Sequence, residues 1–156
     1  MASDQAGADG ITRIVEVGEK PETQREAVAE AWLVSTPAAV ANLIAGTKKG
    51  DPIEAAKIAG IMGVKRTPDL LPFCHPLRIT GVELAIEPQE SAGRIRVRST
   101  VRATDRTGVE MEALTAATVA ALSLYDTTKA FDRAARIEGV RLLRKSGGNS
   151  GEYRAE

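Results

Sequence analysis

The sequence contains only one cysteine and one histidine, and aromatic residues make up 3% of its 156 residues. A single cysteine excludes an internal disulfide and suits a reducing compartment. So few aromatic rings provide no platform on which the bases of a single strand could stack. Basic and acidic residues both number 21, so the chain has no net charge that would attract nucleic acid or an anionic membrane.

Long apolar runs are also absent. No run approaches the roughly 18 residues of a membrane-spanning helix. The first residues, MASDQAGADG, lack the basic and apolar regions of a signal peptide. We therefore expect a soluble cytoplasmic protein with no membrane or nucleic-acid partner. The length fits a single α+β domain over residues 11–156, preceded by a flexible segment over residues 1–10.

The hydrophobic pattern predicts alternating strands and helices. Period-two alternation predicts strands over residues 11–18, 80–88, 93–104 and 139–145, and the second and third form a hairpin. Period 3.6 and capping signals predict helices over residues 37–46, 51–67 and 108–136. Residues 23–36 fit either a helix or a strand. An antiparallel hairpin among helices indicates an α+β sandwich with its helices on one face of the sheet.

The same patterns predict which side chains face the core. We expect Ile53, Ala56, Ile58 and Ile61 to point inward from the second helix, and Met111, Leu114, Thr118, Ala121 or Leu122, and Tyr125 to form the apolar stripe of the third. In the strand 93–104, one face is apolar and the other carries Arg94, Arg96, Arg98 and Arg102. This arginine stripe is either an anion-binding surface or the solvent-facing or subunit-facing side of the sheet.

The only cysteine and the only histidine are adjacent, in PFCHPL at residues 72–77. Neighbouring residues of an extended segment point to opposite sides, so Cys74 and His75 are poorly placed to act as a nucleophile and its base. A zinc site would need more cysteine or histidine ligands than this chain has. We therefore interpret Cys74 as a packing residue and leave His75 open between a structural and a functional role.

Two pairs of charged residues admit both a structural and a chemical interpretation. Glu110 and Glu112 stand at the entrance of the third helix, where carboxylates stabilise a helix N-terminus. If that segment is extended, they instead project to the same side and can bracket a ligand. Asp126 and Lys129, at positions i and i+3, form either a surface ion pair or an acid/base pair.

Two basic segments could bind an anion. Lys48 and Lys49 precede the N-terminus of the second predicted helix, which is a natural place for phosphate. Lys145 precedes the run SGGNSG, whose backbone amides can form an anion-binding nest. An ordinary turn and a flexible tail are the alternatives.

The segments KKGDPIEAAKIAGIMGVKRTPDLLPFCHPL, TGVEMEALTAATVAALSLYD and VRLLRKSGGNSG occur in an order and spacing that resembles one family. That family is molybdenum cofactor biosynthesis protein C, the cyclic pyranopterin monophosphate synthases. The resemblance covers roughly residues 11–153, and its motifs are specific. Phe73 replaces the usual leucine before Cys74, which is a mild departure.

The resemblance implies a ferredoxin-like α+β subunit and a homohexamer, a trimer of dimers with active sites between subunits. It implies a lyase that converts 3′,8-cyclo-7,8-dihydroguanosine 5′-triphosphate into cyclic pyranopterin monophosphate and pyrophosphate. The reaction involves no redox change, so we expect no nicotinamide, flavin or resident metal, although a divalent metal can accompany the substrate phosphates.

The resemblance also implies the site residues. The expected catalytic residues are Lys49, Asp126 and Lys129. The expected substrate-binding residues are Arg25, Phe73, Cys74, His75, Glu110, Met111, Glu112 and Lys145. On a continuous helix Glu112 and Asp126 would lie about 21 Å apart, so we expect one site to combine residues of two chains. The alternative function is a non-catalytic module that binds a phosphorylated nucleotide or a pterin.

Overall fold

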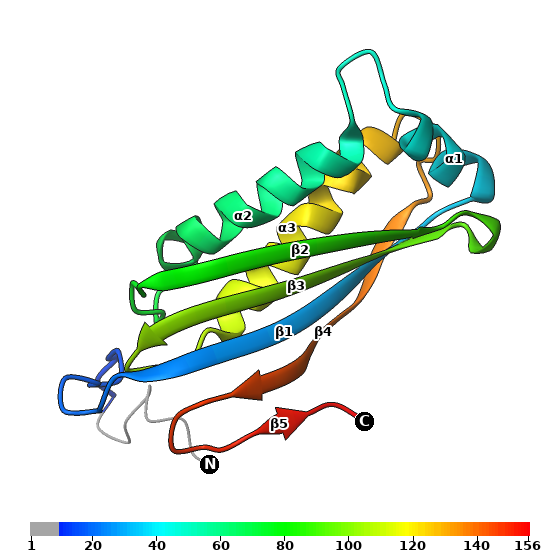
Figure 1. The fold of residues 1–156 in the computed structure, drawn as a ribbon. Helices are drawn as coiled ribbons and strands as arrows, with labels where there is room; N and C mark the ends of the chain where they lie inside the picture. The colour runs from blue at the N-terminus through cyan, green and yellow to red at the C-terminus, as the bar shows by residue number, and fades with distance from the viewer. Residues whose placement is uncertain (1–9) are drawn as a thin grey trace.

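The computed structural model describes residues 10–156, so the flexible segment expected at residues 1–10 lies outside the described residues except for Gly10. The described chain forms a helical layer on one face of an antiparallel sheet (Figure 1). In chain order its elements are β1 (Thr23–Val34), α1 (Pro37–Ala45), α2 (Pro52–Leu70), β2 (Ile79–Gln89), the 3₁₀ turn η1 (Glu90–Ala92), β3 (Arg94–Asp105), α3 (Glu110–Thr128), β4 (Arg136–Ser146) and β5 (Tyr153–Arg154).

The order of the strands identifies the topology. The sheet runs β2-β3-β1-β4-β5, and every neighbouring pair is antiparallel. The helices α1 and α2 connect β1 to β2, the strands β2 and β3 form a hairpin, and α3 connects β3 to β4. Apart from the short edge strand β5, this is the split β-α-β arrangement of ferredoxin-like folds. The predicted fold class is therefore confirmed.

The segment 23–36, whose pattern fits a helix or a strand, forms the central strand β1. Ala27, Ala29, Ala31 and Leu33 are fully buried on its helix-facing side. β1 pairs with β3 on one side and with β4 on the other, so all of its backbone hydrogen-bonding capacity lies inside the sheet. Sheet pairing on both sides overrides the helix propensity of its alanines and glutamates.

The strand predicted at residues 11–18 is wrong, because this segment forms no strand and runs as an irregular lead into β1. β1, the next strand along the chain, is paired on both sides by β3 and β4, so it offers this segment no edge to pair with. Ile11 and Ile14 are accordingly 56% and 43% exposed.

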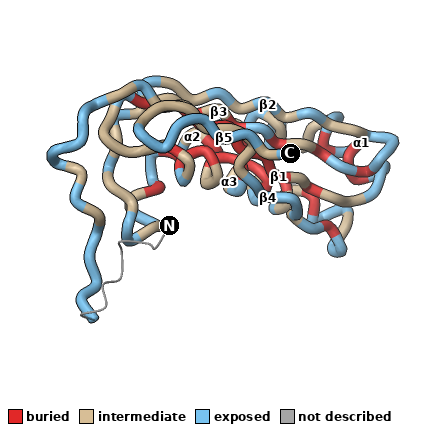
Figure 2. The backbone as a smooth tube through the Cα atoms, turned by 90° about the horizontal axis from the view of Figure 1, so that it is seen from below, coloured by how far each residue is buried: buried red, intermediate tan, exposed pale blue. Residues whose placement is uncertain are grey.

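The helices pack on the sheet and on each other through small residues. α3 crosses β1, β3 and β4, and α2 packs beside it over β2. The buried face of α3 consists mainly of alanines, and the buried face of α2 includes Gly60 and Gly63. Figure 2 shows the buried backbone concentrated where the strands run beneath the helices, with exposed loops at both ends.

The predicted helix faces are only partly right, since Ala56 and Ala121 are fully buried as expected but several large residues are not. Met111 and Leu122 are 41% and 54% exposed, and Ile58 of α2 is 59% exposed, so these large side chains point outward. The alanines and glycines between them point inward instead, because the helices approach each other too closely for large residues. A β-carbon on Gly60 would lie 3.0 Å from the Ala116 carbonyl oxygen, and one on Gly63 would lie 3.2 Å from the Val119 side chain.

The third helix is shorter than predicted, since it ends at Thr128 and not at residue 136. The Thr128 hydroxyl donates to the Leu124 carbonyl, and the Phe131 and Asp132 amides donate to the Thr128 carbonyl, which closes the chain into turns. The Asp132 carboxylate then accepts from the Ala134 amide and leads the chain into β4. Composition alone favours helix here, and these local turn bonds override it.

Gly60→Val tests the close packing of α2 on α3. The valine side chain would collide with the α3 backbone and with Leu84. We expect it to destabilise the fold by about 2 kcal/mol and to lower the midpoint of thermal unfolding by roughly 4–8 °C. Ala55→Val, at an exposed position of the same helix, should change the midpoint far less. Equal midpoints for the two variants in calorimetry would contradict this packing.

Candidate active site

The predicted site residues lie in two groups at opposite ends of α3. The carboxylate cluster gathers near the first turn and comprises Arg25, Phe73, Cys74, His75, Glu110, Met111, Glu112 and Lys145. The lysine cluster gathers near the last turn and comprises Lys49, Asp126 and Lys129. Glu112 and Asp126 belong to one unbroken helix, so about 21 Å of helix separates the two clusters within one chain.

The carboxylate cluster is centred on an ion pair. Lys145 Nζ donates to Glu110 Oε1 at 2.9 Å, and both side chains are less than a third exposed. Lys145 comes from β4, where it pairs with the buried Ala27 of β1. The sheet therefore fixes Lys145 on the helix-facing side, directly opposite the start of α3.

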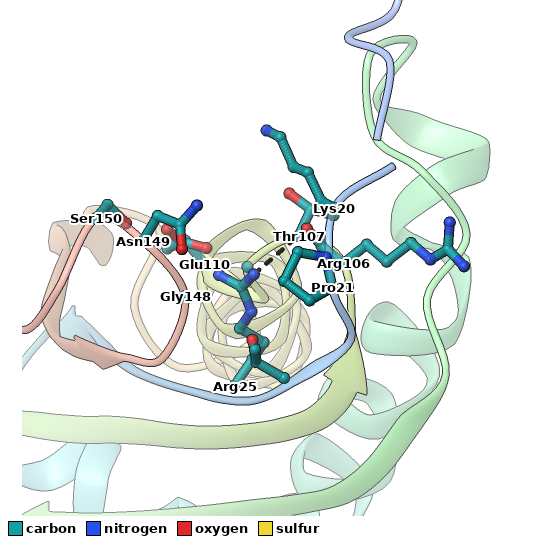
Figure 3. A pocket seen from close by; sticks show the side chains of 11 residues that line it. Lys20, Pro21, Arg25, Arg106, Thr107, Glu110, Gly148, Asn149 and Ser150 are labelled. Carbon is teal, nitrogen blue, oxygen red and sulfur yellow. Dashed lines mark hydrogen bonds between the residues drawn. The ribbon is translucent and has the colours of Figure 1, made fainter. Parts of the chain in front are cut away.

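Arg25 joins this cluster from the start of β1. Its guanidinium donates to the carbonyl oxygens of Gly147 and Arg106, both at 3.3 Å, and its Nε is buried without a hydrogen-bond partner among the described residues. The guanidinium lines a cavity of about 340 Å³ with Glu110, and Figure 3 shows residues 148–150 across from it. Two carbonyls thus hold the cation in place while one side stays open to a ligand.

The glycines that follow Lys145 make this approach possible. Gly147 has a φ of 96°, and a β-carbon there would lie 2.1 Å from the Gln24 carbonyl oxygen. No larger residue fits without moving the segment away from β1. The run SGGNSG therefore wraps over Arg25 and is not a free tail, at least up to Ser150, which lines the cavity.

Glu110 and Glu112 are both helical, so the alternative of an extended segment at residues 108–112 is wrong. The two side chains face different surroundings. Glu110 meets Lys145, whereas Glu112 is 3% exposed and accepts a hydrogen bond from its own backbone amide. Burial, together with the nearby charge of Glu110, raises the pKa of Glu112 to about 7. One carboxylate is therefore held by a cation, and the other is able to carry a proton near neutral pH.

The PFCHPL loop covers Glu112. Phe73, Cys74 and His75 line a cavity of about 290 Å³ with Glu110, Met111 and Glu112, and this cavity shares Glu110 with the one beside Arg25. Burial and the charge of Glu112 raise the pKa of Cys74. A neutral thiol is a poor nucleophile, which agrees with Cys74 as a packing residue at the wall of the site.

The lysine cluster is more exposed. Lys129 Nζ donates to Asp126 Oδ1 at 2.6 Å, in a pair at the end of α3. The Lys129 ammonium and the charge of Lys49 lower the pKa of Asp126, and Asp126 in turn raises the pKa of Lys129. Asp126 is thus ionised and Lys129 protonated at neutral pH. Asp126, Lys129, Lys48 and Lys49 line a cavity of about 540 Å³.

A tight turn places Lys49 in this cavity. Thr47 and Gly50 exchange backbone hydrogen bonds of 2.9 and 3.0 Å, and the Thr47 hydroxyl accepts from the Lys49 amide. Asp51 then caps α2 by accepting from the Ile53 and Glu54 amides. The two lysines therefore project from a defined turn before α2, as predicted, and the structure places this turn next to the end of α3.

Several cavity-lining residues were not predicted from sequence. Lys20 and Thr107 line the cavity beside Arg25, and Ser123 and Phe131 line the lysine cavity. Thr107 begins the TGVEMEALTAATVAALSLYD motif but was not singled out, while Lys20 lies between the strand expected at residues 11–18 and the segment 23–36. Among residues 10–156, no group of three or more His, Cys, Asp or Glu side chains is arranged to hold a metal ion.

The comparisons with known proteins agree with the motifs. The MoaC family model matches residues 14–148. The chain belongs to the MoaC family. It is 50% identical over 149 residues to a cyclic pyranopterin monophosphate synthase of Parvibaculum lavamentivorans, covering 94% of this chain and 92% of that protein. It is also 50% identical over 151 residues to the cyclic pyranopterin monophosphate synthases of Brucella ovis and Brucella melitensis. Each of these matches covers 96% of this chain and 90% of the other protein. The family recognised from the motifs is thus confirmed.

The raised pKa of Glu112 predicts how the stability of the folded protein changes with pH. Because its pKa is raised from the usual value to about 7, the folded state keeps a proton that the unfolded state has lost, so stability falls as pH rises across this window. Between about pH 5 and about pH 8 the loss should approach about 3 kcal/mol. Glu112→Gln should flatten this part of the curve.

Urea unfolding at several pH values measures the effect, and the readout is the difference between wild type and Glu112→Gln. Glu152→Gln, at an exposed position outside the cluster, is the matched control and should keep the wild-type dependence. Parallel curves for wild type and Glu112→Gln would show that Glu112 ionises freely in the folded protein.

Proposed function

We propose that this chain is a cyclic pyranopterin monophosphate synthase of molybdenum cofactor biosynthesis, converting 3′,8-cyclo-7,8-dihydroguanosine 5′-triphosphate into cyclic pyranopterin monophosphate and pyrophosphate. Family membership and the names of relatives that cover nearly the whole chain support this activity. The observation that carries the proposal is the pairing of a cation-rich cavity at one end of α3 with a carboxylate-lined cavity at the other. A substrate with a triphosphate at one end and a purine-derived ring at the other needs both.

The cations suit the phosphates. A triphosphate carries about four negative charges, and the protein offers Lys49, Lys129, Arg25 and Lys145 at the two clusters. We propose that Lys49 and Lys129 bind and polarise phosphate, with Arg25 and Lys145 completing the charge balance from the other cluster. Lys48, on the same turn as Lys49, adds a further positive charge to that cavity.

The rearrangement breaks a purine-derived C–N bond, closes a new ring and forms a cyclic phosphate, and each step moves protons. Lys129 is protonated and Asp126 ionised at rest, so Lys129 is placed to donate a proton and Asp126 to accept one. We propose that Glu110, Glu112 and His75 hydrogen-bond the ring edge and the ribose, with Phe73, Cys74 and Met111 forming the wall around them.

The separation of the clusters supports a site built from two chains. About 21 Å of helix lies between Glu112 and Asp126, which exceeds the reach of one compact ligand. We therefore propose that the carboxylate cluster of one subunit meets the lysine cluster of another in a homohexamer, a trimer of dimers. We further propose a cytoplasmic enzyme that needs no redox cofactor, because the reaction is redox-neutral; a divalent metal can accompany the phosphates. No helix of residues 10–156 is long and apolar enough to cross a membrane.

Measuring product formation distinguishes an enzyme from a module that only binds the nucleotide. Lys49→Ala and Lys129→Ala should each lower kcat at least 100-fold, because each removes a charge that acts on the reacting phosphate or proton. Substrate binding, measured by calorimetry, should weaken far less. Lys65→Ala, at an exposed position of α2, is the matched control and should leave kcat unchanged. Substrate binding by the wild type without product formation would refute the synthase.

Mixing inactive subunits tests the shared site. After subunit exchange, Asp126→Ala and Glu112→Ala proteins should recover roughly a quarter of wild-type activity, because a quarter of the sites then combine two intact clusters. Asp126→Ala mixed with Lys129→Ala should recover none, since both changes lie in one cluster. If the first mixture also stays inactive once exchange is verified, each site belongs to a single chain.

A further inference from the structure

Four segments of the chain meet beside the lysine cluster, at the end of the molecule that carries α1 and the tip of the β2–β3 hairpin (Figure 1). Ser35, which directly follows β1, is the centre of this junction. Its amide donates to the Gly93 carbonyl at 2.7 Å, and its hydroxyl donates to Asp132 Oδ2, also at 2.7 Å. The next residue, Thr36, caps α1 by accepting from the Ala39 amide. The junction therefore joins the sheet, the hairpin, α1 and the turn after α3.

Asp132 holds the turn that leads from α3 to β4. One carboxylate oxygen accepts from Ser35, and the other accepts from the Ala134 amide at 2.8 Å. The Asp132 amide donates to the Thr128 carbonyl at 2.9 Å. Both oxygens of a half-buried carboxylate are thus engaged, and the turn is tied to the last residue of α3 at one end and to the sheet at the other.

The same turn carries part of the proposed active site. Lys129 and Phe131 lie between the last residue of α3 and Asp132, and both line the lysine cavity. The backbone of Lys129 is held by its amide bond to the Tyr125 carbonyl at 2.9 Å, and its side chain is 57% exposed. Helix ends open readily unless something outside the helix holds them. The distance between Lys129 and Asp126 therefore depends on how firmly the turn is held.

The junction is also connected to the other wall of this cavity. Thr36 fixes the start of α1, and α1 ends at Gly46, directly before the turn of Lys48 and Lys49. Lys49 is thus joined to the junction through α1, and Lys129 is joined to it through Asp132. The place of one lysine relative to the other is set where these two connections meet.

We infer that Asp132, held by Ser35, is a positioning residue of the lysine cluster, which keeps Lys129 against Asp126 and opposite the turn of Lys49. Its part in catalysis rests on the synthase activity proposed above. Asp132 acts through geometry, because it lies outside the cavity lining formed by the described residues. The groups that raise the pKa of Lys129 are Asp126 and Tyr125, so Asp132 does not act as a neighbouring charge.

The pair that Asp132 holds sets a pH window. The contact between Asp126 and Lys129 lowers the pKa of the first and raises the pKa of the second. If the turn loosens, both pKa values move back towards their ordinary range, and the window in which Asp126 is ionised and Lys129 protonated narrows from both sides. The other charged groups around the pair are Lys48, Lys49 and Asp51, which a change at position 132 leaves in place.

Replacing Asp132 tests the inference. Asp132→Ala removes the bonds to Ser35 and Ala134, and we expect kcat to fall by roughly ten-fold or more, with KM changed less than about three-fold. The pH profile of kcat should narrow on both limbs. Asp132→Asn keeps both bonds, because its amide oxygen accepts from Ala134 and its amide nitrogen donates to the Ser35 hydroxyl, so it should restore most of kcat and the wild-type profile.

Ser35→Ala provides a second variant, because it removes only the bond between β1 and the turn. It should lower kcat and narrow the profile in the same direction, and it carries the test if Asp132→Ala does not fold. Ser91→Ala, at an exposed position of η1, is the matched control and should behave as the wild type. Circular dichroism at the assay temperature confirms that each variant is folded.

A titration of Lys129 gives a readout that does not depend on turnover. In protein with ¹³C-labelled lysine, the Lys129 signal is assigned by its loss in Lys129→Arg, and it should titrate at lower pH in Asp132→Ala than in the wild type. Unchanged kcat and titration in a folded Asp132→Ala, or equal loss in Asp132→Asn, would overturn the inference. A shifted titration together with a wild type that makes no product would support the positioning role and refute the synthase alone.

Discussion

The fold depends on the close contact of α3 with the central strand. Alanines line the buried face of the helix, and alanines at 27, 29 and 31 line the strand beneath it. Small residues on both surfaces bring the helix backbone near the sheet, close enough for the Ser99 hydroxyl to donate to the Ala113 carbonyl at 2.6 Å. Such a contact holds α3 straight and in one register, because a shift would place larger side chains against a surface that cannot admit them. Every site residue is positioned relative to this helix.

A rigid α3 acts as a spacer between two chemically distinct ends. Its N-terminal turn carries two carboxylates in unlike surroundings, one bound by Lys145 and one buried under the PFCHPL loop. Its C-terminal turn carries Asp126 and brings Lys129 beside it. Because the separation is set by helix length, movement within one subunit cannot close it, and chemistry that needs both ends requires a second chain. The assembly proposed for this enzyme would thus follow from the length of the helix.

Sequence reasoning found the fold class and most elements where a signal was local or carried by a motif, and it named candidate site residues that the structure places at the two ends of α3. It placed Lys48 and Lys49 on a turn before a helix, and it found the hairpin of β2 and β3. It failed where the outcome depends on tertiary packing. The segment 11–18 was expected to be a strand but forms none, and the large residues Ile58, Met111 and Leu122 were assigned to the inward faces of α2 and α3 although glycine and alanine occupy much of those faces. The unequal surroundings of Glu110 and Glu112 were also invisible, since they come from β4 and from the loop at Cys74.

Arginines and lysines serve different purposes in this chain. This difference explains how a protein with no net charge can bind the triphosphate of its proposed substrate. On the sheet face opposite the helices, the planar guanidinium groups of Arg96 and Arg102 each bridge two carboxylates, so their charge is cancelled within the sheet. The lysine cluster uses compact ammonium groups, and Asp126 offsets only part of their charge. Neutrality of the whole molecule therefore conceals a local excess of positive charge, and that excess lies at the end of α3. A charge count over the sequence cannot reveal this, because the cancelling glutamates lie on other strands than the arginines they bind.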